Sequence, residues 1–109
     1  MTNFTFYRDR DNGSLVGFRA EDHAGFAAYG SDVVCAGISA LTINAVNSIS
    51  TLTDDRCEQF VSAENTVIEL RIKDIPSVEC DILLKSLELG IKSISNSYRG
   101  HVKVDYSEV

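Results

Sequence analysis

The sequence has few basic residues, and this shortage narrows the partners that the chain can have. Ten lysines and arginines stand against sixteen aspartates and glutamates, which gives a net charge of −6 at pH 7. A surplus of negative charge repels phosphates, and no basic patch offsets it, so we expect no nucleic-acid partner. An acidic surface attracts basic partners, although many soluble proteins are acidic merely for solubility.

Signals for membranes, secretion and disulfides are also missing. The N-terminus, MTNFTFYRDRDNG, has no apolar signal region, and no run approaches the ~20 apolar residues of a membrane span. We therefore expect a cytoplasmic protein without a membrane partner. Cys35, Cys57 and Cys80 form an odd set without CxxC spacing, which favours reduced thiols over a disulfide framework or a zinc site. We interpret Cys57 and Cys80 as small buried apolar residues.

What the sequence does contain is enough apolar material for one domain over residues 1–109, because 44% of the residues are hydrophobic. Alternating apolar residues predict strands over 4–8 and 14–19, with Asn12 and Gly13 in the hairpin turn between them. Further strands are predicted over 59–62 and 66–73, joined by a turn at 63–65. Alternation of Val102, Val104 and Tyr106 predicts a last strand.

Helical periodicity fills the two remaining segments. The first helix starts just before Cys35, with Ser31 or Asp32 as its N-cap, and its apolar face holds Val34, Ile38, Leu41, Ala45 and Ile49. The second begins with the single proline, Pro76, in its first turn, and its predicted apolar face holds Val78, Ile82, Leu83, Leu87, Ile91 and Ile94. The order ββαββαβ predicts an α+β fold, a largely antiparallel sheet with two helices packed on one face.

Cys35 is the residue with the most chemical promise. A thiol attacks as the thiolate, and both a nearby imidazolium and a helix N-terminus favour that form. A position in the first turn would place Cys35 at the helix N-terminus. His23 could supply the imidazolium, making a Cys-His pair for nucleophilic attack and leaving-group protonation. Backbone N–H groups at the helix start could hold an oxyanion.

The segment between the two residues has the composition of a substrate loop. Gly25 and Gly30 give it conformational freedom, while Phe26 and Tyr29 are able to cover a bound substrate. The same aromatics could equally fill the nearby core of an ordinary connection.

A polar stripe on the first helix borders this candidate site. Asp32, Cys35, Ser39 and Thr42 follow spacings of three, four and three and therefore share one face. Asp32 either orients His23 or caps the helix, and Ser39 either lines the site or bonds back to the helix backbone.

Spacing alone does not decide for catalysis, because a histidine and a cysteine this close are more often unrelated packing or surface residues. A metal site is not expected either, since structural zinc needs four ligands and His101 and the other cysteines lack paired spacing. We expect no metal and no cofactor.

The segment DHAGFAAYGSDVVCAGISAL resembles the ribosomal-processing cysteine protease Prp family in its HAG, YG, D, VCA and S elements. The resemblance covers the whole chain in length and element order. It implies that His23 and Cys35 form the catalytic dyad, with Asp32 and Ser39 as supporting residues.

The same resemblance implies a homodimeric cytoplasmic endopeptidase that removes an N-terminal extension from large-subunit ribosomal protein twenty-seven. The family usually has glycine before this histidine, whereas this chain has Asp22. A glycine there could adopt a backbone conformation that aspartate resists, and a carboxylate beside His23 favours its charged form. The alternative that this departure keeps open is a non-catalytic, ribosome-associated protein-binding module on the same fold.

Overall fold

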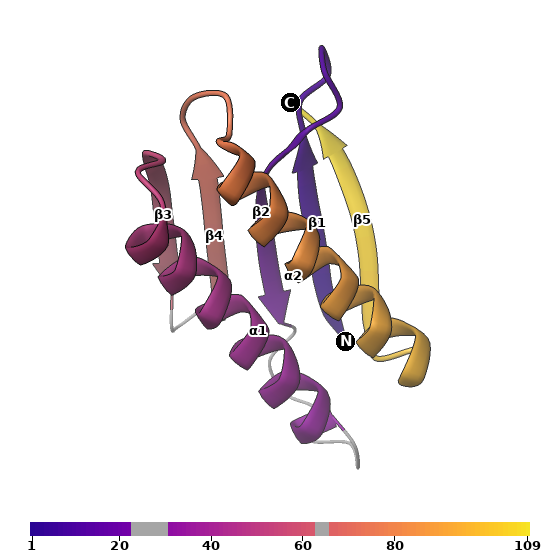
Figure 1. The fold of residues 1–109 in the computed structure, drawn as a ribbon. Helices are drawn as coiled ribbons and strands as arrows, with labels where there is room; N and C mark the ends of the chain where they lie inside the picture. Colours follow the sequence, from indigo (N-terminus) through magenta and orange to yellow (C-terminus); the bar gives the residue numbers. More distant parts are fainter. Residues whose placement is uncertain (23–30, 63–65) are drawn as a thin grey trace.

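The computed structural model describes residues 1–22, 31–62 and 66–109, and these residues form the predicted ββαββαβ order (Figure 1). The elements are β1 (Thr2–Arg8), β2 (Leu15–Asp22), α1 (Ser31–Leu52), β3 (Cys57–Ser62), β4 (Val67–Ile72), α2 (Val78–Ser97) and β5 (Val102–Glu108). The main difference from the predicted bounds is in the first hairpin, where both strands are longer.

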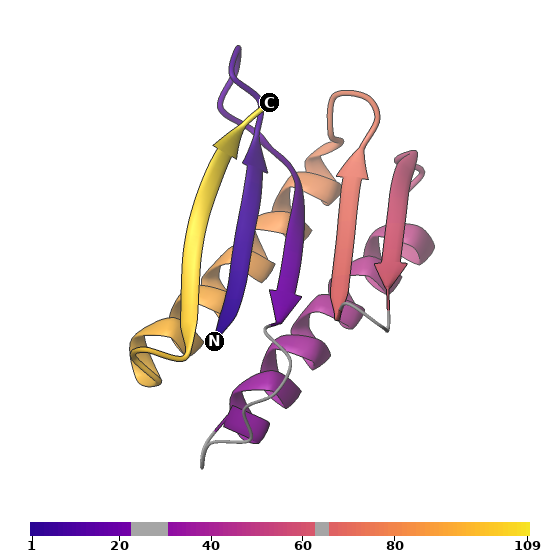
Figure 2. The same cartoon turned by 180° about the vertical axis from the view of Figure 1, so that it is seen from behind.

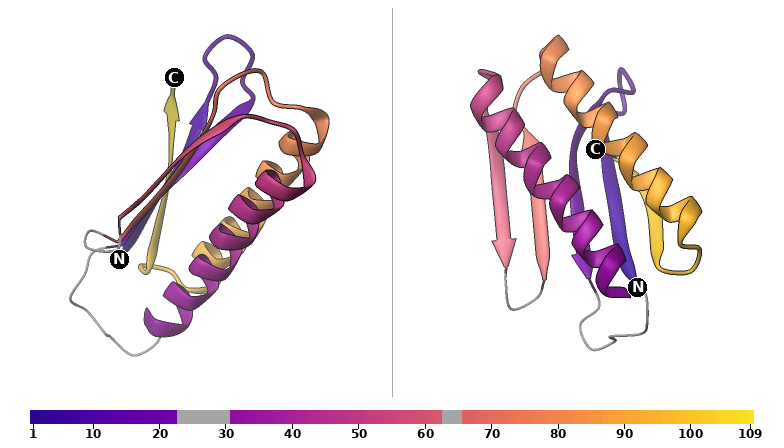
Figure 3. Two further views of the ribbon diagram at one scale, coloured as in Figure 1. Left: turned by 90° about the vertical axis from the view of Figure 1, so that its left-hand side faces the viewer. Right: turned by 60° about the horizontal axis from the view of Figure 1, so that its bottom comes forward.

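The five strands form one sheet in the order β3-β4-β2-β1-β5. Neighbouring strands are antiparallel except β1 and β5, which run parallel. Both helices lie side by side over one face of this sheet (Figure 3), and none of the described residues forms a helix over the opposite face (Figure 2). The predicted largely antiparallel sheet with two helices on one face is therefore confirmed.

The core lies between the sheet and the helices. Alternation along β1 and β2 places the rings of Phe4, Phe6 and Phe18 on the covered face, where all three are fully buried and pack together. The predicted face of α1 meets them: Val34, Ile38, Ala45 and Ile49 are buried, and Leu41 is partly buried against the core.

The predicted face of α2 is partly wrong. Val78 and Ile82 are 74% and 60% exposed, whereas the buried residues are Cys80, Leu84, Leu87 and Ile91. Pro76 is not in the first turn either, because Ser77 is the N-cap and its hydroxyl accepts a hydrogen bond from the Cys80 backbone N–H. Asp55, which follows α1, accepts hydrogen bonds from the backbone N–H (2.8 Å) and the hydroxyl of Ser77. This anchor fixes the residue at which α2 starts.

The helix α1 is long and strongly apolar, which raises the question of a membrane span. The expectation that no run approaches a membrane span is wrong for this helix, because residues Val33–Leu52 are long and apolar enough, by length and composition alone, to cross a membrane. A core helix of a soluble protein passes the same test, and the inner face of α1 packs against the sheet and α2. The length of this helix is therefore weak support for a membrane span.

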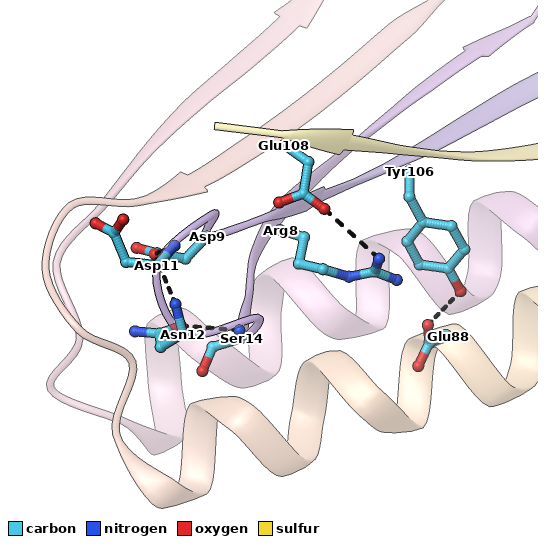
Figure 4. A network of polar contacts seen from close by, with 8 residues as sticks. All are labelled: Arg8, Asp9, Asp11, Asn12, Ser14, Glu88, Tyr106 and Glu108. Carbon is cyan, nitrogen blue, oxygen red and sulfur yellow. Dashed lines mark hydrogen bonds and ion pairs between the residues drawn. The ribbon is translucent and has the colours of Figure 1, made fainter.

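Polar contacts close the end of the sheet where β1 and β2 are joined (Figure 4). The Asp9 carboxylate accepts from the backbone N–H groups of Asp11 and Asn12, and the Asn12 side chain accepts from that of Ser14. Gly13 has a positive φ of 75°, a left-handed conformation that glycine adopts without strain. Nearby, the guanidinium of Arg8 lies 3.8 Å from the Glu108 carboxylate, which fastens the last strand at this end.

Candidate active site

A cleft of about 190 Å³ lies at the opposite end of the sheet, between α1 and the ends of β2, β3 and β4. The start of α1 extends past this end of the sheet, and the helix then passes over it (Figure 1). From α1, the residues Cys35, Ile38, Ser39 and Thr42 line the cleft. The cleft therefore contains the cysteine with the most chemical promise.

Three polar residues of α1 face this cleft because of their spacing. Cys35, Ser39 and Thr42 are separated by four and three residues, so they follow one another along a single helix face. Cys35 is half-buried and Thr42 is fully buried. The predicted polar stripe is confirmed for these three residues, while the side chain of its fourth member, Asp32, lies outside the described part of the structure.

The sheet supplies an apolar wall opposite the stripe. Ala20 of β2 pairs with Ile68 of β4, and Ile68 pairs with Val61 of β3. These three side chains point to the same face of the sheet, because directly paired residues in neighbouring strands share a face. Val61 is 66% exposed, so the wall has an open apolar surface near the sheet edge. Such a cleft suits an apolar side chain of a ligand.

Charge is scarce in the cleft. Among its described lining residues only Glu21 is ionisable other than the Cys35 thiol, and its carboxylate lies 3.5 Å from the Arg19 guanidinium. The remaining polar lining comes from hydroxyl groups, including those of Ser39 and Ser62. A ligand in this cleft would be bound through shape and hydrogen bonding rather than through a charged anchor.

The start of α1 lies one or two residues earlier than the prediction. The helix begins at Ser31, so neither Ser31 nor Asp32 stands before the first helical residue. Cys35 consequently lies at the start of the second turn, where its own N–H belongs to the helical ladder. The unpaired N–H groups of the first turn precede Cys35 along the chain, and they are the donors that an oxyanion near the thiol could use.

Several predicted site residues are not covered by the structure. His23 and the predicted substrate loop, with Gly25, Phe26, Tyr29 and Gly30, lie outside the described residues. Asp22 is described through its backbone as the last residue of β2, paired with Thr2. Any residue can adopt an extended strand conformation. The backbone at Asp22 therefore does not require the glycine that the family usually has before the histidine.

The other two cysteines have different surroundings. Cys80 is fully buried in the core, as predicted, and burial together with the nearby Asp55 carboxylate raises the pKa of its thiol to about 12. Cys57 is the first residue of β3, at the opposite end of that strand from the cleft. It is half-buried and packs against the core. Neither residue lines the cleft.

We expect Cys35 to be the fastest of the three thiols to react with iodoacetamide in the folded protein at pH 7. Because its pKa is raised to about 12, the Cys80 thiol is almost entirely protonated at that pH, and the core also shields it. Peptide mapping after brief alkylation measures the order of labelling. Faster labelling of Cys57 or Cys80 would contradict Cys35 as the nucleophile.

The residues of β3 and β4 were absent from the sequence-based site. Val61 and Ile68 form a wall only because β3 and β4 pair and bring them opposite α1. No local pattern distinguishes them from other apolar strand residues. Only the pairing register, which is a long-range property, could have identified them.

Comparisons with known proteins place this geometry in a family. The protein-family model described as cysteine protease Prp matches residues 1–103. The ribosomal processing cysteine protease Prp of Staphylococcus aureus (strain Mu50) is 27% identical over 96 residues, which cover 88% of this chain and 91% of the relative.

Solved structures of that protease have the same fold. Prp from S. aureus in complex with a substrate peptide matches with a TM-score of 0.91 and 24% identity, over 98% of this chain and all of the other. The same protease with a covalently linked product peptide matches with a TM-score of 0.86 and 25% identity, over 98% and 100% of the two chains.

Proposed function

Since the chain belongs to the cysteine protease Prp family, we propose that it removes an N-terminal extension from a ribosomal protein, with Cys35 and His23 as its catalytic dyad. The observation that carries this proposal is the position of Cys35 in a cleft with an apolar wall. A cleft of about 190 Å³ is large enough for a side chain of a peptide substrate, since a cavity of ~150 Å³ takes up benzene.

The proposed mechanism assigns the chemistry to Cys35. Its thiolate sulfur attacks the carbonyl carbon of the scissile peptide bond, and the tetrahedral intermediate then expels the amine. His23 gives the departing amine its proton and later takes one from the water that hydrolyses the thioester. The first-turn N–H groups of α1 stabilise the negative oxygen of each intermediate. The covalent product peptide in the S. aureus relative supports a covalent intermediate of this kind.

As substrate we propose the precursor of large-subunit ribosomal protein twenty-seven. Support comes from the ribosomal processing activity in the name of the relative and from charge, because ribosomal proteins are basic and this chain has a net charge of −6. We further propose that the protein acts in the cytoplasm, where ribosomes assemble, and that it works as a homodimer.

The precursor itself tests the function. Incubating the protein with purified ribosomal protein twenty-seven that carries an N-terminal extension should yield one shortened product, and mass spectrometry of the intact product locates the cleaved bond. The precursor incubated alone controls for spontaneous breakdown. Binding of an uncleaved precursor would instead support the non-catalytic module.

A further inference from the structure

Thr42 has an unusual environment for a polar residue. Its side chain is fully buried, and its hydroxyl oxygen has no hydrogen-bond partner among the described residues. A buried hydroxyl without a partner is unfavourable, because it loses its bonds to water and gains none in return. Valine has nearly the same shape without this disadvantage, so the hydroxyl needs an explanation.

The helix backbone does not provide the missing partner. A threonine in a helix commonly donates to the carbonyl one turn earlier. Thr53, directly after α1, does this with a 2.7 Å bond to the carbonyl oxygen of Ile49. Thr42 has no such bond to Ile38. Its hydroxyl therefore remains available to a group from outside the described core.

The cleft is where such a group can come from. Thr42 lines it two helical turns beyond Cys35, which corresponds to about 10 Å along the helix at 1.5 Å per residue. A long side chain that starts near the scissile bond, or a residue about three positions away in an extended peptide, covers that distance. The wall opposite is apolar, formed by residues such as Val61 and Ile68.

We propose that Thr42 is a specificity-determining residue, whose hydroxyl bonds the polar end of a peptide side chain with an apolar body. This inference rests on the proposed protease function, because it assigns the cleft to the substrate. The hydroxyl is closed to bulk water without a ligand, so the entering side chain reaches it by turning aside a neighbouring side chain, a common change on binding. The cleft thereby favours tyrosine over phenylalanine at one substrate position.

Peptides that differ only by one hydroxyl test this role. Phenylalanine and tyrosine are exchanged at each of the three positions on either side of the cleaved bond, and kcat/KM is measured for the wild type, Thr42→Val and Thr42→Ser. We expect the wild type to favour tyrosine about tenfold at one position, as one added hydrogen bond implies. Thr42→Val should lose this preference, and Thr42→Ser should keep it. Thr51→Val, the same change at an exposed residue of α1 outside the cleft lining, should also keep it.

A second measurement separates this inference from the proposed function. The affinities of the same peptides for Cys35→Ala protein, with and without Thr42→Val, report recognition without cleavage. If the wild type cleaves no peptide, the proposed function fails and the affinities alone decide the role of Thr42. The inference is overturned if no position favours tyrosine, or if the Thr42→Val protein retains the preference, as it would with a buried water as the partner.

Discussion

Replacing Cys35 with alanine is expected to abolish precursor cleavage, with kcat reduced by at least about a thousandfold. The sulfur is the only atom of this side chain that can form the covalent intermediate, and no neighbouring group on the described cleft wall is a comparable nucleophile. The residue is half-buried at the edge of a cleft, so removing one atom should disturb little packing. Product formation followed by mass spectrometry measures the loss, and a thermal unfolding curve verifies the fold.

Cys57→Ala is the matched control for this experiment. Cys57 is also a half-buried thiol, but it lies at the end of β3 away from the cleft, so its replacement should leave cleavage near the wild-type rate. The Cys35→Ala protein should still bind the precursor, because the apolar wall is unchanged. Undiminished turnover by the Cys35→Ala protein would rule out the proposed mechanism.

Replacing Gly17 with alanine is expected to destabilise the protein by about 3 kcal/mol or more. Gly17 lies in β2 opposite Arg71 of β4, with φ +155°. A Cβ at this position would collide with the carbonyl oxygen of Leu70 and stand 3.0 Å from the Cα of Arg71. Both obstacles are backbone atoms, so relief requires the central strands to move apart. Urea denaturation should show a midpoint lower by about 1 M or more.

Gly13→Ala separates the clash from the cost of an unusual backbone angle. Gly13 has φ +75° in the hairpin turn, but nothing lies within 4 Å of a Cβ built there. Its replacement should therefore cost only the conformational penalty of about 1–2 kcal/mol. An equal loss of stability in the two variants would show that the close approach of β2 and β4 is not the reason for a glycine at position 17.

On the outer face of the sheet, the absence of a side chain at Gly17 leaves room for a contact between its two neighbours. The guanidinium of Arg71 lies 4.6 Å from the centre of the Tyr7 ring, reaching across the residue between them in the sheet. The Tyr7 hydroxyl donates to Glu69 at 2.7 Å, and burial together with this carboxylate raises the pKa of Tyr7 to about 12. The neutral phenol is thus favoured in the folded state. The resulting stabilisation is complete below pH 10 and is lost as the pH rises toward 12.

The sequence by itself determined the order of elements and the candidate nucleophile. Alternation and helical periodicity are local properties, so the seven elements follow from neighbouring residues, and the face of α1 with Val34, Ile38 and Ile49 follows from spacing. The stripe of Cys35, Ser39 and Thr42 is local for the same reason. The residues alone suggested His23 as a partner of Cys35 without deciding for it, and the family resemblance, carried by one segment of the chain, made the pair an expected catalytic dyad.

Only the tertiary structure decided how these parts meet. The apolar residues of α2 extend around more of the helix than the core covers, and the docking of α2 on the sheet and α1 buried Cys80 and Leu84 rather than Val78 and Ile82. The cleft wall needed the pairing of β3 with β4 and of β4 with β2, between residues far apart in the chain. Only the packed structure showed that the Thr42 hydroxyl has no hydrogen-bond partner among the described residues. Pairing, docking and burial depend on the whole chain at once, and therefore no local pattern contains them.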